Sequence, residues 1–250
     1  MIASLKSELR KIWTVRSTYL LLLLSFVVMC IFAFWIEGVK AGESSKVVTD
    51  PTKLASLMSD AITNLAFWGS LVGILLATHE YRYNTIMYTL TASRSRTKTL
   101  LAKVVAVSIY AVLFSIFVVV FAAALMLLGL TIKGHTLSHQ VIPHDLWWRV
   151  IFEGWAMSMF GLLLAMLIRV QVGAFAAFFI IQVAIEPLAG LVLKDNRIYL
   201  PFLALQQVTA LMGSDIHHVL SHGRAALVVC AYLIVGWIVA WILFLKRDAN

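Results

Sequence analysis

Six runs of apolar residues, each long enough to cross a membrane as a helix, constrain this chain more than any other feature of its sequence. A helix needs roughly 20 apolar residues to cross about 30 Å of hydrocarbon. Of its 250 residues, 62% are hydrophobic and only 13% are charged, whereas a soluble domain is nearer half apolar and a quarter charged. We therefore expect an all-α integral membrane protein, one transmembrane domain over residues 1–250, with six transmembrane helices at Thr18–Ile36, Ala61–Thr78, Val104–Leu130, Val150–Ile168, Val170–Leu193 and Ala225–Leu245.

The basic residues that flank the runs predict the orientation of the chain. With both termini in the cytoplasm, 12 of the 20 Lys and Arg residues fall on inner segments and 8 on outer segments, as the positive-inside rule favours. We expect a multi-pass protein of the plasma membrane whose first run is retained rather than cleaved. The net charge of +8 comes from these clusters, so it does not indicate nucleic-acid binding.

Two further segments are apolar but are not expected to cross the membrane. Residues 1–17 place Ile2, Leu5, Leu9 and Ile12 on one helical face, with Lys and Arg around the other, which is typical of an interfacial helix. The outer region 194–224 contains the apolar stretch Ile198–Met212. This stretch is too short to span, so we expect a re-entrant or interfacial helix pair. Pro201 is expected to mark a helix start or break there.

Acidic residues inside the fourth and fifth runs raise the question of a functional site. Glu186 precedes Pro187, and an ionisable group next to a proline kink at membrane depth is often functional. The alternative is a structural carboxylate near the outer headgroups, paired with Lys194 or Arg197. Glu153 is expected to be structural. Only Arg169 separates the two runs, so a tight turn there predicts that their helices are neighbours.

Histidines and cysteines offer weaker signals. The spacings His135/His139 and His218/His222 could align two imidazoles on a helix face, but no cysteine or close carboxylate completes a ligand set, so no metal site is expected. Cys30 and Cys230 both lie inside apolar runs and are expected to be small buried residues.

Sequence motifs for common hydrolytic chemistry are absent from the chain. It has no GxxxxGK[ST] phosphate loop, no HExxH and no GxSxG, so we expect no ATPase or hydrolase activity and no cofactor in this chain. If it performs transport work, the energy must come from another chain or from an ion gradient.

The loop His79–Lys103, HEYRYNTIMYTLTASRSRTKTLLAK, is the most informative inner segment. Its simplest interpretation is a positive-inside loop, but its internal apolar residues indicate a short helix that presents a surface to a cytoplasmic partner. Together with the N-terminal SELRKIWTVRSTYLLL, six spans and the apolar outer segment, it resembles the type-2 permease family of ATP-binding-cassette (ABC) exporters. The family often has Gly before the loop threonine and Pro before the arginine-rich turn; here Asn84 precedes Thr85 and Ser93 precedes Arg94.

The resemblance implies an export permease that forms the substrate path as a dimer on separate ABC ATP-binding subunits, with ATP and magnesium bound by those partners. Residues 79–103 would be the coupling loop, residues 1–17 the family's connecting helix, and Ile198–Met212 a cap over the path. Residues that it assigns to coupling or to its return to the membrane are Glu80, Tyr81, Arg82, Thr85, Arg94, Arg96 and Lys103. A secondary transporter or a non-transporting membrane scaffold are the alternatives.

Overall fold

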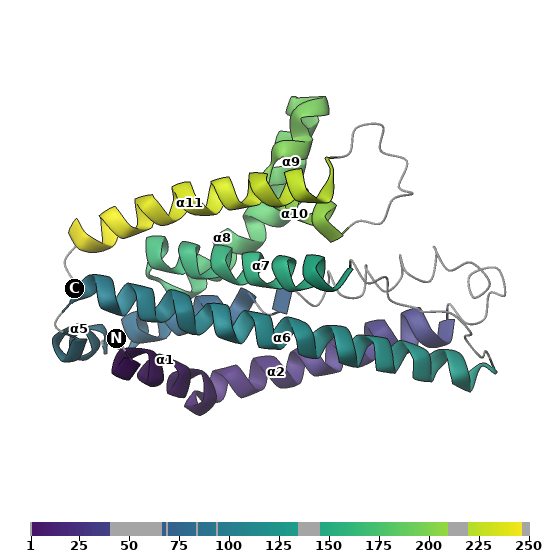
Figure 1. Ribbon diagram of the computed structural model, residues 1–250, viewed down its shortest axis with the longest axis horizontal. Coiled ribbons are helices and arrows are strands. Elements are labelled where there is room, and N and C mark those ends of the chain that lie inside the picture. The colour runs from purple at the N-terminus through teal and green to yellow at the C-terminus, as the bar shows by residue number, and fades with distance from the viewer. Residues whose placement is uncertain are drawn as a thin grey trace.

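Long helices lying side by side form this protein (Figure 1). The computed structural model describes residues 2–40, 67–68, 70–83, 85–93, 95–134, 146–209 and 220–246, and no strand occurs among them. Residues 67–68 and 70–82 are helical. The other elements are α1 (Ile2–Thr14), α2 (Arg16–Met29), the π-helix η1 (Cys30–Lys40), α5 (Ile86–Ser93), α6 (Arg96–Ile132), α7 (Leu146–Ile168), α8 (Gln171–Ile180), the π-helix η3 (Ile181–Ile185), α9 (Glu186–Leu193), the 3₁₀-helix η4 (Lys194–Tyr199), α10 (Pro201–Thr209) and α11 (His222–Lys246).

Five helices in the described ranges are long and apolar enough to cross a membrane. They are Thr18–Lys40, Arg96–Ile132, Leu146–Ile168, Gln171–Tyr199 and His222–Lys246. Four of them contain a predicted run in full, and Gln171–Tyr199 contains all of the run Val170–Leu193 except Val170. Of the remaining run, Ala61–Thr78, residues 61–66 and 69 lie outside the described part of the chain.

Exposed apolar side chains cover much of these helices, as expected where lipid is the solvent. Leu113 on α6, Leu191 and Val192 on α9, and Leu227 on α11 are all more than half exposed. In water, an exposed apolar surface of this extent would favour aggregation. By the length and composition of its helices, the chain is a multi-pass membrane protein.

Small residues let the central helices approach closely. A Cβ added to Gly161 of α7 would lie 2.6 Å from the carbonyl oxygen of Ser70, and one added to Gly73 would lie 2.6 Å from that of Ser158. A Cβ on Gly154 would lie 2.0 Å from Oγ of Ser115 on α6. Such contacts are the usual means by which helices pack in lipid, where apolar burial alone gives little drive for association.

The first and last described residues lie near the same end of the bundle. In Figure 1, the start of α1, all of α5, the start of α6 and the yellow end of α11 gather at the left. We call this the polar end, because it brings together the charged residues of α1 and of residues 79–103.

The helix 171–199 is not a regular α-helix along its whole length. Arg169 takes the left-handed backbone conformation (φ 61°), and this tight turn places α8 against α7, as predicted. The widened turns of η3 follow α8, and α9 then projects beyond α11 (Figure 1). A π-helical segment next to Pro187 gives the bend a physical cause.

Candidate functional site

Four charged side chains from three helices form a buried cluster at the polar end. Nζ of Lys103 on α6 lies 3.1 Å from Oε2 of Glu8 on α1 and 2.8 Å from Oε2 of Glu80. Nζ of Lys11 lies 2.8 Å from Oε1 of Glu8 and also contacts Oε1 of Glu80. Each ammonium group therefore lies between both carboxylates, and the cluster is electrically neutral.

Burial makes the geometry of this cluster important. Lys103 is only 1% exposed, Glu8 2% and Glu80 3%. Unpaired charges in such surroundings would cost several kcal/mol each. The cluster therefore fixes α1 against α6 and against the end of the helix that contains Glu80.

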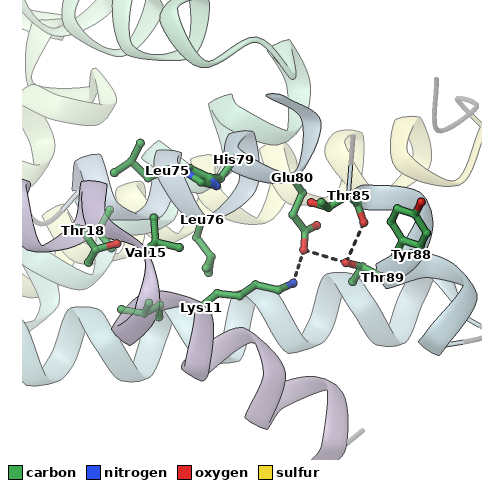
Figure 2. A pocket seen from close by; sticks show the side chains of 12 residues that line it. Lys11, Val15, Thr18, Leu75, Leu76, His79, Glu80, Thr85, Tyr88 and Thr89 are labelled. Carbon is green, nitrogen blue, oxygen red and sulfur yellow. Dashed lines mark hydrogen bonds and ion pairs between the residues drawn. The ribbon is translucent and has the colours of Figure 1, made fainter. Parts of the chain in front are cut away.

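The short helix α5 joins the cluster through a hydroxyl group. Oγ1 of Thr89 donates a hydrogen bond to Oε1 of Glu80 at 3.0 Å, and it also lies 3.3 Å from the carbonyl oxygen of Thr85 (Figure 2). Glu80 thus contacts side chains from α1, α5 and α6, so a displacement of α5 would disturb all three contacts.

Glu80 remains ionised at neutral pH. It follows the second apolar run, which ends at Thr78. Burial alone would raise the pKa of its carboxyl group, but the ammonium groups of Lys103 and Lys11 outweigh this effect and hold the pKa below its usual value. The carboxylate is therefore protonated only in acid.

A pocket of about 280 Å³ opens beside the cluster (Figure 2). Lys11, Glu80, Thr85 and Thr89 line its polar side, and apolar residues that include Val72, Leu75 and Leu76 line the other. The lining of this pocket is therefore polar on one side and apolar on the other.

Several exposed side chains on and next to α5, at the polar end, are apolar or aromatic. Tyr88 is 77% exposed and Met87 50% exposed on α5, and Tyr83 just before it is 56% exposed. Aromatic and methionine side chains are enriched at protein interfaces. This face of α5, with Thr85 and Thr91 also exposed, is the surface that a partner at this end would meet.

The predicted coupling residues divide between this surface and the interior. Glu80 and Lys103 are buried, so neither presents its side chain to a partner directly. Arg82 and Thr85 are exposed. Tyr81 is half-buried, with the guanidinium carbon of Arg169 5.3 Å from its ring centroid.

The remaining coupling candidates lie where the loop returns to the bundle. Nη1 of Arg96 donates hydrogen bonds to the carbonyl oxygens of Leu245 at 3.1 Å and Phe244 at 3.4 Å. A cation there satisfies the last carbonyls of α11 and favours its dipole. Arg94 lies outside the described residues.

Sequence reasoning missed Glu8, Lys11 and Thr89. The signal for Glu8 was available: it lies one turn from both Leu5 and Ile12, on the apolar face of α1. A carboxylate on an apolar face needs a cation, and Lys103 at the start of the third run was the candidate. The contact of Thr89 with Glu80 had no such signal.

Glu186 contacts backbone groups, not the predicted cations. Its Oε1 accepts a hydrogen bond from the backbone N–H of Phe202 at 2.7 Å, and its Oε2 accepts one from Leu203 at 2.9 Å. Both donors belong to the first turn of α10, whose free N–H groups and dipole favour an anion. Pro201 begins that helix, as predicted. Neither Lys194 nor Arg197 pairs with Glu186 in the described part of the chain.

The remaining sequence candidates are Glu153 and the outer histidines. Glu153 is buried on α7, as is Arg149 one turn before it. Of the four histidines named as metal candidates, only His222 is described: its Nδ1 lies 3.0 Å from the carbonyl oxygen of Gln207. His135, His139 and His218 lie outside the described residues.

Comparison with known protein families and with curated proteins gave no match.

Proposed function

We propose that this chain is the membrane-spanning permease subunit of an ATP-driven ABC exporter, working as a dimer on separate ATP-binding subunits. One observation carries the proposal: the exposed helix α5 is linked through Thr89 and Glu80 to a buried charge cluster that also holds α1 and α6. A subunit that pushes on the face of Met87 and Tyr88 would act on all of these helices together.

The division between exposed and buried groups suits a coupling role. The exposed face of α5 would bind the partner, whereas Glu80 would transmit the displacement to Lys11 and Lys103. Because α6 is 37 residues long, about 55 Å at 1.5 Å per residue, it exceeds the roughly 30 Å of hydrocarbon. Its first turns would extend into the cytoplasm and receive that displacement.

The topology that we propose has six spans with both termini in the cytoplasm of the cell. Support comes from the start of α1 and the end of α11, which lie near one end of the bundle (Figure 1), since an even number of crossings returns a chain to its starting side. Single cysteines at Ser45 and Ser138, in a background lacking Cys30 and Cys230, should react with an impermeant reagent in intact cells, whereas one at Ser95 should not. External labelling at Ser95 would reverse the orientation.

In this proposal, Glu186 and Pro187 position the short helix α10 rather than contact the substrate. The carboxylate accepts two backbone hydrogen bonds from α10, one on each oxygen, and these hold it against the start of that helix.

The exporter proposal is tested by purifying the tagged chain from its native membranes in mild detergent. We expect a cytoplasmic ATPase to co-purify and ATP hydrolysis to accompany it. The variant Tyr88→Asp, which places a charge on the exposed face of α5, should reduce this recovery, and Tyr199→Asp in η4 should not. Recovery of the chain without ATPase, together with gradient-driven transport in vesicles, would support a secondary transporter instead.

A further inference from the structure

A second hollow near the polar end lies between the ends of three helices. It has a volume of about 350 Å³ and is lined by Arg16, Leu20, Leu21, Leu75, Gln171 and Phe175. Arg16 is the first residue of α2 and Gln171 the first of α8. Leu75 lies within the helix that ends at residue 82. We call this hollow the Arg16 groove.

The rim of the Arg16 groove is positively charged. Nη1 of Arg82 donates a hydrogen bond to Oε1 of Gln171 at 3.2 Å, so a second guanidinium group reaches the same rim as Arg16. Both arginines are exposed, and no ion pair joins either of them to a carboxylate within the described ranges. The acids of the neighbouring charge cluster, Glu8 and Glu80, are paired with lysines.

The wall below this rim is apolar. Leu20 and Leu21 lie about one turn along α2 from Arg16, and Phe175 lies one turn along α8 from Gln171. Leu75 is seven residues before Arg82, about 10 Å along its helix. Cations at the helix ends with leucine and phenylalanine deeper along the same helices match the headgroup and acyl regions of one membrane leaflet.

We propose that the Arg16 groove binds an anionic phospholipid, with the phosphate at Arg16 and Arg82 and an acyl chain along Leu20, Leu21 and Phe175. Guanidinium groups suit phosphate oxygens because they offer several donors in one plane. The ligand would belong to the leaflet at the polar end. The proposal depends on the helices crossing a membrane and not on the exporter function, so the two can fail separately.

The test is native mass spectrometry of the purified full chain in detergent with equal amounts of phosphatidylglycerol and phosphatidylcholine of identical acyl chains. We expect preferential binding of phosphatidylglycerol. Because one basic residue near a membrane surface contributes about a fivefold affinity for anionic lipid, Arg16→Gln and Arg82→Gln should each lower phosphatidylglycerol binding about fivefold. Arg82→Lys, which keeps the charge, should retain most of it.

The matched control is Arg10→Gln, which removes an exposed cation from α1 outside the groove and should leave lipid preference unchanged. All variants are compared by thermal unfolding, and the exposed positions of Arg16 and Arg82 predict little change. Equal binding of the two lipids, an equal loss in Arg10→Gln, or displacement of phosphatidylglycerol by millimolar inorganic phosphate would each overturn the proposal. The last outcome would indicate a site for free anions.

Discussion

The ammonium group of Lys103 lies 2.8 Å from the carboxylate of Glu80, and both side chains are almost completely enclosed by protein. This pair joins the long helix α6 to the helix that precedes α5. Lys11, which is partly exposed, and the buried Glu8 complete the cluster around it, so each charge has a partner.

Removing one member of the pair should be more harmful than removing both. Lys103→Met leaves two buried carboxylates with only Lys11 between them, and we expect a loss of about 3–5 kcal/mol in the free energy of unfolding. The double variant Glu80→Leu/Lys103→Met retains the balanced Glu8–Lys11 pair and should recover most of that loss. Unfolding in mixed micelles of sodium dodecyl sulfate measures both. Additive losses in the double variant would show that the two charges do not depend on each other.

The same carboxylate predicts how stability responds to acid. The pKa of Glu80 in the folded protein lies below its ordinary value of 4.5, so between the two values the unfolded chain binds more protons. The contribution of Glu80 is therefore fully present above pH 4.5 and is lost as pH falls through the folded-state pKa. Thermal unfolding of the wild type and of Glu80→Gln should differ at neutral pH and converge in acid. A difference that is independent of pH would argue against this ionised state.

Glu186 should stabilise α10 locally. Replacing it with Gln leaves one acceptor oxygen for two N–H groups and removes the charge, so we expect a cost of about 1–3 kcal/mol and faster amide exchange at Phe202 and Leu203. Asp195→Asn, which neutralises an exposed acid in η4, is the control and should change neither. Unchanged amide exchange in Glu186→Gln would show that Glu186 does not cap α10.

The close crossing at Gly161 should not accept even a methyl group. In Gly161→Ala the new Cβ would meet the carbonyl oxygen of Ser70 at 2.6 Å, and backbone must move, at a cost of about 1–3 kcal/mol. At Gly223, in the first turn of α11, a Cβ meets no atom within 4 Å. Gly223→Ala should therefore be neutral or stabilising by up to about 1 kcal/mol. Equal thermal midpoints for the two variants would contradict this account of the helix crossing.

Features that follow from local sequence patterns could be predicted, whereas contacts between residues far apart in the sequence could not. The apolar runs, the amphipathic α1 and the helix start at Pro201 follow from local patterns, so they could be predicted. The burial of Glu80 could not, because its cations come from residues 11 and 103. For Glu186 the sequence left open a functional role and pairing with a cation, but it did not indicate that the N-terminus of α10 folds back onto this carboxylate. The widened turns of η3 carry no sequence signal beyond Pro187.

The most direct test of the exporter proposal is photo-crosslinking from the exposed face of α5. A photoreactive phenylalanine analogue replaces Tyr88, which is 77% exposed, and the same analogue at the exposed Tyr199 of η4 is the control. After irradiation of native membranes, we predict that Tyr88 yields a crosslinked product containing an ABC ATPase and that Tyr199 does not. A Tyr88 product without an ATPase, or the same product from both positions, would contradict the proposal.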